Sequence, residues 1–315
     1  MTLISDTAAA KSPDGGVMPP VVIAEIGCNH KGDMAIAREM VQIAKIFCEV
    51  DYVKFQKRTN RELLSRDQYD SPHPVPNNSY GATYGEHREF LEFDIDQHAE
   101  LKELCEEIGI GYSCSVWDFT SLKEIISLKP DHIKIPSAMN NHWELLGRMC
   151  DDYPGDLHVS LGMTTPEEEA KIIDLFQAHD RLQDLVLYHC TSGYPVPARD
   201  ICLLGIPRLV NEYGHRVKAI GFSAHYTGIG LDGPAFVLGA NYIERHFTMD
   251  RAWKGTDHAA SLEPDGLRRV RKDTLTVAEA MRDKERDILE IEEPQREKLK
   301  FRPAGASVPH PGTRD

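Results

Sequence analysis

Two segments set the expected fold of this chain: VKAIGFSAH at residues 217–225 and YIERHFTM at residues 242–249. Each is short, rich in apolar and aromatic residues, and carries polar side chains at alternate positions, as a β-strand does. Working outward from them, six earlier segments have the same character: VVIAEIG (21–27), DYVKFQ (51–56), YSCSVW (112–117), HIKIPS (132–137), LHVSLGM (157–163) and LVLYHCT (185–191).

Helical patterns lie between these strands, such as MAIAREMVQIAKIF at residues 34–47 and PEEEAKIIDLFQAH at residues 166–179. A proline followed by glutamates, as at Pro166, favours a first helical turn. Eight strand–helix units in about 250 residues, with no domain-scale linker, predict an α/β protein with a closed (β/α)₈ TIM barrel. A doubly wound open sheet is the structural alternative.

The predicted barrel occupies residues 20–290, after a disordered leader at 1–19 and before a proline-rich, charged C-terminal extension at 291–315. A long insertion at residues 58–96, rich in turn-forming residues, separates the second strand from the second long helix. Barrel loops of this kind carry function. We therefore expect the insertion to lie near the active site.

Composition narrows the class of protein. The chain has 315 residues, of which 41% are hydrophobic and 27% charged, and these are ordinary values for a globular protein. No apolar segment approaches the roughly 18 residues of a membrane helix, and the N-terminus does not resemble a secretory signal. The seven cysteines form no CxxC pair, so we expect a reducing, cytoplasmic setting. A net charge of −14 argues against binding to nucleic acid or to an anionic membrane.

The alternation within each strand divides its side chains between two faces. An apolar face, suited to packing against helices, contains Val53, Phe55, Ile133, Ile135, Ile220, Phe222, Ile243 and Phe247. The other face is polar in all eight strands and contains Glu25, Lys54, Gln56, Ser113, Ser115, Lys134, His158, Ser160, His189, Thr191, Ser223, His225, Glu244 and His246. Barrel interiors are normally filled by branched apolar residues, so a polar interior indicates a ligand. The alternative is that these polar groups only satisfy one another.

Two kinds of site follow from this face. His225 and His246 end consecutive strands, where their imidazoles can converge on a divalent ion such as Mn²⁺, or simply form a hydrogen-bonded pair. Lys54 and Lys134 place two cations at the barrel mouth, and nearby hydroxyls complete a phosphate cradle. These hydroxyls belong to Ser115, Ser137, Ser160, Ser192 and Ser223. The lysines could instead pair with inward glutamates.

Eight segments give the chain a family resemblance: AEIGCNHKGD, VKFQK, KIPSAMNN, SLGMTTPEE, HCTSGYPVP, GFSAH, GANYIERHF and KGTDHAASLEPD. In this order and spacing the chain resembles the sialic acid (N-acetylneuraminate) synthase family over most of residues 20–300. The resemblance implies a transferase that condenses phosphoenolpyruvate with an open-chain sugar aldehyde. It also implies a Mn²⁺ or Mg²⁺ requirement, and a 2-keto-3-deoxy, nonulosonic-type sugar acid and phosphate as products. A homodimer is a further expectation.

The resemblance also implies roles for individual residues. His225 and His246 match the metal ligands, and Lys54, Ser115, Lys134, Ser137, Ser160 and Ser223 match positions that bind phosphoenolpyruvate, with Ser192 expected beside them. Gln56, Tyr194 and Asp257 match positions that contact the sugar or an intermediate. Glu25 matches the carboxylate that holds the acceptor, and Glu25 or Asp257 would transfer protons. Lys54 and Lys134 complete the predicted catalytic group.

Three departures from the family concern the acceptor side. Met139 stands where the family has an acidic residue facing the sugar, and Ala224 replaces the aspartate of an SDH motif. We also expect this chain to lack the family's C-terminal antifreeze-like domain. The departures predict an acceptor other than N-acetylmannosamine. The alternatives are a 3-deoxy-octulosonate or heptulosonate type of synthase, and a noncatalytic relative that binds a sugar acid.

Overall fold

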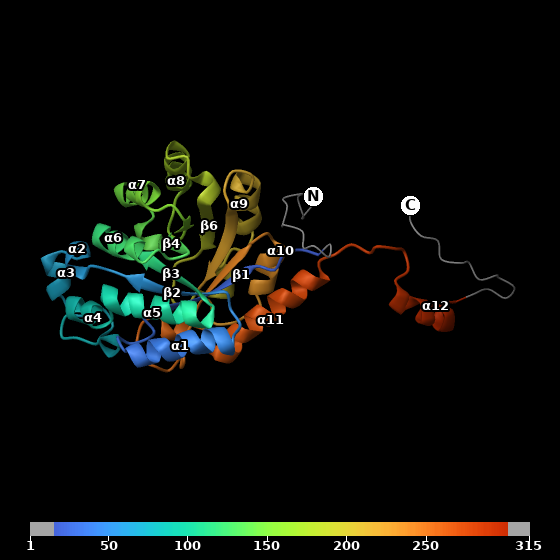
Figure 1. The fold of residues 1–315 in the computed structure, drawn as a ribbon, viewed down its shortest axis with the longest axis horizontal. Helices are drawn as coiled ribbons and strands as arrows, with labels where there is room; N and C mark the ends of the chain where they lie inside the picture. The colour runs from blue at the N-terminus through green and yellow to red at the C-terminus, as the bar shows by residue number, and fades with distance from the viewer. Residues whose placement is uncertain (1–15, 302–315) are drawn as a thin grey trace.

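The computed structural model describes residues 16–301, and these form a closed barrel of eight parallel strands surrounded by helices (Figure 1). Each strand pairs with the next in chain order, and β8 pairs with β1 to close the ring. The predicted (β/α)₈ fold is therefore confirmed, and the open sheet is excluded.

The eight strands match the predicted segments to within a few residues at each end. They are β1 (Val21–Gly27), β2 (Tyr52–Lys57), β3 (Gly111–Val116), β4 (His132–Ile135), β5 (Asp156–Ser160), β6 (Leu185–Cys190), β7 (Ala219–Ala224) and β8 (Tyr242–His246). The α-helices are α1 (Met34–Ile46), α2 (Asn60–Leu63), α3 (Arg66–Asp70), α4 (Tyr84–Phe90), α5 (Ile95–Ile108), α6 (Phe119–Ser127), α7 (Trp143–Asp152), α8 (Pro166–Ala178), α9 (Gly205–Tyr213), α10 (Asp232–Val237), α11 (Pro264–Ala280) and α12 (Glu293–Leu299). The 3₁₀ turns are η1 (Pro76–Asn78), η2 (Ser137–Met139), η3 (Leu182–Asp184), η4 (Ala198–Asp200), η5 (His258–Ala260) and η6 (Glu290–Glu292).

Local sequence explains where the long helices begin. The Asp33 carboxylate accepts from the backbone N–H groups of Ala35 and Ile36 at the start of α1. At α8, Thr165 and Glu168 form a reciprocal capping box, and Pro166 is the first helical residue as predicted. Such caps satisfy N–H groups that have no partner within the helix.

Two hydrophobic layers hold the barrel. The larger one lies between the strands and the helices and contains the predicted outward residues, such as Phe55, Ile133 and Phe222. The smaller one fills the N-terminal end of the barrel interior with Ile23, Val186 and Tyr188. The inner layer blocks the barrel at that end, so polar inward residues nearer the strand C-termini can face a ligand.

The insertion at residues 58–96 follows β2 as expected, but it is more ordered than its turn-forming residues indicated. It contains the short helices α2, α3 and α4, which lie together beside α5 (Figure 1). Capping boxes start α3 and α4, at Ser65 and Thr83. The Tyr80 hydroxyl donates to the backbone carbonyl of Lys254 in the loop after β8. The insertion is therefore attached to the end of the barrel at which the strands finish.

The structure describes only part of each predicted terminal segment. Of the predicted leader, residues 1–15 lie outside the described residues, and so do residues 302–315 of the predicted extension. Within that extension, α12 stands apart from the barrel after a non-helical stretch that follows α11 (Figure 1). Among the helices of residues 16–301, none is both long enough and apolar enough to span a membrane.

Candidate active site

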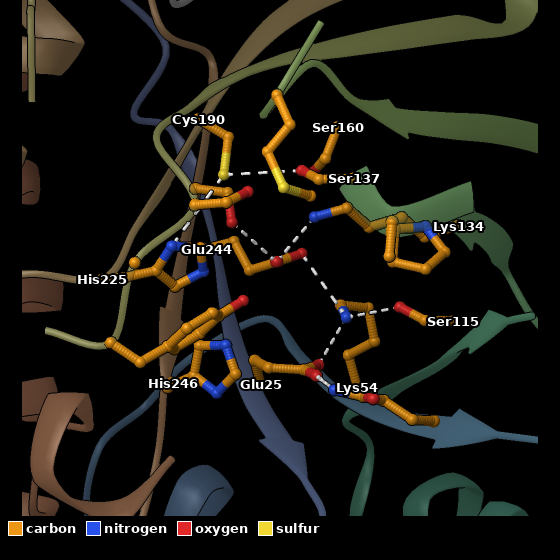
Figure 2. A pocket seen from close by; sticks show the side chains of 18 of the residues that line it. Glu25, Lys54, Ser115, Lys134, Ser137, Ser160, Cys190, His225, Glu244 and His246 are labelled. Carbon is orange, nitrogen blue, oxygen red and sulfur yellow. Dashed lines mark hydrogen bonds and ion pairs between the residues drawn. The ribbon is translucent and has the colours of Figure 1, made fainter. Parts of the chain in front are cut away.

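A cavity of about 340 Å³ opens where the strands end (Figure 2). Its size is in the usual range for a small-molecule site. It is lined by twelve of the predicted site residues: Glu25, Lys54, Gln56, Ser115, Lys134, Ser137, Ser160, Ser192, Tyr194, Ser223, His225 and His246. These come from all eight strands or the loops that follow them. The fold therefore brings most of the predicted site into one pocket.

The centre of the pocket is an ion-pair cluster around Glu244 (Figure 2). The Lys134 ammonium donates to Glu244 Oε1 at 2.6 Å, and the Lys54 ammonium lies 3.8 Å from Glu244 Oε2. Ser223 also donates to Oε1, at 3.0 Å. All four side chains are buried. Sequence reasoning placed Glu244 on the inward face and left open that the lysines pair with inward glutamates, and the structure has that pairing.

Burial and neighbouring charges shift the pKa values of the groups in this cluster. Burial alone would raise the pKa of Glu244, but the ammonium groups of Lys134 and Lys54 outweigh it and hold that pKa well below its usual range. Burial raises the pKa of Glu25, although Lys54 opposes the shift. Burial likewise lowers the pKa of Lys134, and the ion pairs of the two lysines with Glu244 and Glu25 oppose the cost of burying these charges. Two lysines are thus held at the base of a pocket that is ringed by hydroxyl groups. Such a pocket suits an anion.

Hydroxyl groups surround the lysines. Lys54 donates to Ser115 Oγ at 2.7 Å, which places that hydroxyl beside the cation. On the opposite wall, the Gly162 N–H donates to Ser137 Oγ at 3.1 Å. A β-carbon at residue 162 would lie 2.4 Å from Ser192 Oγ and 2.6 Å from Ser137 Oγ. Only glycine therefore allows the two hydroxyls to approach this turn together.

Glu25 is held from two sides. One carboxylate oxygen, Oε2, forms an ion pair with Lys54, and the other, Oε1, accepts from the Gln56 side-chain amide at 2.6 Å. The backbone of β1 bulges between Glu25 and Gly27, where φ is +55°. A β-carbon at Gly27 would lie 3.0 Å from Glu25 Oε1 and 3.1 Å from Gln56 Nε2. A side chain at this position would be strained and would crowd the bond.

His225 and His246 lie with their ring centroids 5.2 Å apart, and the Tyr194 ring covers them at 4.3 Å and 5.6 Å. His225 Nδ1 lies 2.9 Å from the Thr191 carbonyl oxygen. A carbonyl can only accept, so Nδ1 carries the proton and Nε2 keeps a free lone pair. His246 Nδ1 is buried without a hydrogen-bond partner. Two oriented imidazoles of this kind fit an open divalent-ion site.

The rest of such an ion's coordination would come from outside the protein's donor side chains. Within residues 16–301, no group of three or more His, Cys, Asp or Glu side chains is arranged to hold a metal. Asp257, the nearest acidic candidate to His246, has Oδ2 at 3.8 Å from His246 Nδ1. Water or substrate would therefore have to occupy the remaining positions, as in catalytic metal sites.

Two predicted site residues lie outside the pocket wall. Asp257 is not among the residues that line the cavity, but its Oδ2 lies 3.8 Å from His246 Nδ1. Met139 is half-buried and packs against the core between strands and helices. The pocket wall nearby is formed by Ala138 and Met163 instead. Met139, in η2, is thus not part of the cavity lining, and its contact with the acceptor stays a prediction.

Strand β6 corrects the predicted inward face. His189 and Thr191 were expected inside, but Tyr188 and Cys190 point inward, opposite Ser160 and Ser223 on the neighbouring strands. The His189 ring contacts the Ile201 carbonyl oxygen at 2.8 Å and stacks on the outward Phe222. Cys190 therefore lines the pocket, with its sulfur 3.8 Å from Ser137 Oγ and 3.9 Å from His225 Nδ1.

The polar residues deeper in the barrel contact one another, in partial agreement with the alternative interpretation, although His132 Nε2 and His158 Nε2 are buried without a hydrogen-bond partner. His158 stacks on His132 at 3.9 Å and contacts the Tyr188 hydroxyl through Nδ1 at 2.9 Å. Ser113 donates to the His132 carbonyl oxygen at 3.1 Å. Neither these histidines nor Ser113 lines the cavity. The polar interior thus has a ligand-facing layer above a structural layer.

Comparison with known proteins finds sugar-acid synthases that resemble this chain. Human N-acetylneuraminate-9-phosphate synthase is 35% identical over 292 residues, which cover 90% of this chain and 77% of the human protein. The N,N'-diacetyllegionaminic acid synthase of Legionella pneumophila is 33% identical over 261 residues, covering 82% and 72% of the two chains. The sialic acid synthetase structure from Leptospira borgpetersenii matches the fold with a TM-score of 0.75 at 24% identity, over 90% of this chain and 94% of that one.

The family match covers the barrel rather than an isolated motif. The sequence model of the NeuB family aligns with residues 40–286, from α1 through α11. The curated relatives named above are both sugar-acid synthases, in agreement with the predicted sialic acid synthase family. On these matches, the chain belongs to the NeuB family.

Proposed function

We propose that this enzyme joins phosphoenolpyruvate to the aldehyde carbon of an open-chain sugar, giving a 2-keto-3-deoxy sugar acid and inorganic phosphate. One observation carries the proposal: Lys54 and Lys134 lie together, buried, inside a pocket ringed by hydroxyls. Two lysines with hydroxyl donors around them suit a small anion. Phosphoenolpyruvate supplies both a carboxylate and a phosphate for these groups.

In the proposed complex, the two ammonium groups pair with the anionic groups of phosphoenolpyruvate, and Ser115, Ser137 and Ser192 donate hydrogen bonds to its oxygens. Charge-assisted contacts of this type are the strongest in a binding site. Glu244 keeps both lysines in place between turnovers. This assignment accounts for two buried lysines among hydroxyl donors in one pocket.

The reaction forms one carbon–carbon bond and one carbon–oxygen bond, and it breaks the carbon–oxygen bond to phosphate. C3 of phosphoenolpyruvate attacks the aldehyde carbon, and the aldehyde oxygen becomes a hydroxyl. Water then adds at C2, and phosphate leaves with the bridging oxygen. Glu25 is placed to hold or release a proton, since burial raises its pKa and its carboxyl group faces the pocket. Asp257 acts on the site through His246.

We further propose that His225 and His246 hold Mn²⁺ or Mg²⁺. When bound, such an ion polarises a carbonyl oxygen as a Lewis acid. Within the protein, the Thr191 carbonyl orients His225, and Tyr194 covers both rings and limits the access of water. Cytoplasmic location and a homodimer remain predictions.

The test of this function is phosphate release from phosphoenolpyruvate in the presence of Mn²⁺ and a panel of aldoses and N-acylated hexosamines. We expect release only when an aldose is present, together with a 2-keto acid product. If phosphate appears at the same rate without any aldose, or never appears with any of them, the proposal is wrong.

Metal dependence is the first specific prediction. EDTA should abolish phosphate release and added Mn²⁺ should restore it, and His246→Ala should reduce Mn²⁺ affinity by at least about tenfold, because it removes one of two imidazole ligands. Mn²⁺ binding is measured by electron paramagnetic resonance of the free ion, which does not depend on activity. His215→Ala is the control, because His215 is exposed and lies in the turn that follows α9. Unchanged Mn²⁺ binding by His246→Ala would rule out this ligand.

The second prediction concerns which bond breaks. With ¹⁸O in the bridging position of phosphoenolpyruvate, we expect the label to leave in inorganic phosphate, because water supplies the new oxygen at C2. Mass spectrometry of both products measures its position. Label retained in the keto acid would show that the P–O bond is the one cleaved, contrary to the proposed chemistry.

A further inference from the structure

Arg58, the first residue of the insertion, connects this segment to the pocket. Its Nη2 group donates to Gln56 Oε1 at 2.8 Å and contacts Cys28 Sγ at 2.5 Å. Gln56 in turn donates through Nε2 to Glu25 Oε1. The contacts thus run from Arg58 through the Gln56 amide to the carboxylate that faces the acceptor. Arg58 itself does not line the cavity.

Glu92, at the other end of the insertion, holds Arg58. Its Oε1 lies 2.7 Å from Arg58 Nε, and its Oε2 accepts from the Arg58 backbone N–H at 3.0 Å. The Arg58 and Glu92 side chains are only 8% and 11% exposed, so the pair is shielded from water. Burial of both partners makes the geometry of the guanidinium group well defined. Two residues 34 positions apart therefore fix one donor beside Gln56.

This donor decides which way the Gln56 amide points. A carboxylate that can be protonated, as Glu25 can, is able to accept from an amide N–H or donate to an amide oxygen, so Glu25 does not settle the orientation. A guanidinium can only donate. Arg58 therefore keeps Gln56 Oε1 on its own side, and the Gln56 NH₂ group faces Glu25 and the pocket in either protonation state of Glu25.

The orientation has a consequence for the acceptor. One N–H of Gln56 is used by Glu25, and the second is left for the pocket, which Gln56 lines. This side chain can thus offer a hydrogen bond to an oxygen of the acceptor but cannot accept one. Gly27 leaves room for the same bond on the β1 side, since a β-carbon there would lie 3.1 Å from Gln56 Nε2.

We propose that Arg58 and Glu92 are positioning residues for the sugar acceptor. They hold the Gln56 amide, and with it Glu25, so that an N–H group of Gln56 points into the pocket. The inference rests on the proposed function for its kinetic consequences. It gives the insertion a specific task, since both positioning residues belong to it. The residues act through Gln56 and contact no substrate themselves.

The kinetic test is a double-mutant cycle in the holoenzyme. Arg58→Lys keeps a positive charge for Glu92, but its single ammonium cannot span Glu92 and Gln56 as the guanidinium does. We expect it to raise the acceptor KM about tenfold and to change the phosphoenolpyruvate KM less than about twofold. Gln56→Ala should raise the acceptor KM by a similar factor. The acceptor KM of the double variant should exceed that of Gln56→Ala by less than about twofold.

Two further variants separate positioning from folding. Arg58→Met with Glu92→Met removes the ion pair without leaving a buried charge unpaired and should reproduce the kinetics of Arg58→Lys. Arg271→Lys is the matched control, because Arg271 pairs with Asp51 at the opposite end of the barrel. Its KM values should stay at the wild-type level. If Arg58→Lys raises the acceptor KM equally with and without Gln56, the positioning role is overturned.

A readout that needs no turnover separates this inference from the proposed function. In protein labelled with ¹⁵N at glutamine side chains, the Gln56 NH₂ signals are assigned by their loss in Gln56→Ala. We expect Arg58→Lys to shift or broaden these signals, and Arg271→Lys to leave them unchanged. If no aldose supports phosphate release, the proposed function fails while this measurement still stands. Unshifted Gln56 signals in Arg58→Lys would overturn the inference itself.

Discussion

Replacement of Glu244 by leucine is expected to lower the free energy of unfolding by about 3–5 kcal/mol and to abolish phosphate release. Glu244 is 3% exposed and is the carboxylate shared by Lys134 and Lys54. Without it, two buried ammonium groups face each other, and only Glu25, whose carboxyl group is pushed toward its neutral form, remains beside them. Removing one member of a buried charge group is costly because the other is left desolvated and unpaired.

Urea unfolding at neutral pH measures the effect, and two variants isolate its cause. Ser223→Ala removes only a hydroxyl donor to Glu244, so it should cost about 1 kcal/mol. Combining Glu244→Leu with Lys134→Met removes one charge of each sign. The combined variant should regain most of the lost stability while remaining inactive. A Glu244→Leu protein as stable as the wild type would mean that the cluster does not depend on this carboxylate.

Much of the fold could be predicted because each strand can be recognised from its own residues, without reference to the rest of the chain. VVIAEIG, for example, coincides with β1, and Pro166 with the start of α8. The ring closure followed from the count of eight strand–helix units. The short helices of the insertion could not be seen in the same way, because segments of four to seven residues have little periodicity and are stabilised by capping boxes and packing.

Strand β6 shows that the alternation of side chains within one segment does not determine which face points into the barrel. In the segment LVLYHCT, both faces contain apolar residues and both contain a residue able to bond, so polarity alone favoured His189. The structure turns Tyr188 and Cys190 inward because the register with β5 and β7 fixes the face. Register depends on neighbouring strands and is not encoded within one segment.

Individual site residues could be predicted from the sequence more easily than the ion pairs between them. Lys54 and Lys134 were visible as inward cations, but their common partner Glu244 is reached only across the closed barrel. The Arg58–Glu92 pair likewise joins the two ends of an insertion whose path could not be inferred. The structure shows which charged residues lie close in space although they are distant in sequence.

Acid should destabilise this protein well before its ordinary carboxylates are protonated. His30, His98 and His132 are buried, and burial is the largest of the causes that lower the pKa of each to about 3. These side chains stay neutral in the folded protein, whereas in the unfolded chain they take up protons near pH 6.5. The unfolded state therefore binds more protons, and stability rises with pH. The stability that these neutral histidines contribute is complete above about pH 6.5, and it is lost as the pH falls from there toward 3.

His98 gives the sharpest measurement of this effect. Its Nδ1 contacts the Tyr112 hydroxyl at 2.7 Å, its Nε2 is buried without a partner, and its ring packs among aromatic side chains. In urea unfolding between pH 7 and pH 5, each such histidine should cost about 1 kcal/mol for every pH unit below 6.5. His98→Phe keeps an aromatic ring in this space and should reduce the pH slope of stability by about that amount. The exposed His215→Gln should leave the slope unchanged, because solvent surrounds that residue in both states. Other titrating groups are common to all three proteins and cancel in the comparison. A His98→Phe slope equal to that of the wild type would mean that this imidazole is protonated inside the folded barrel, and the acid sensitivity would then have to arise elsewhere.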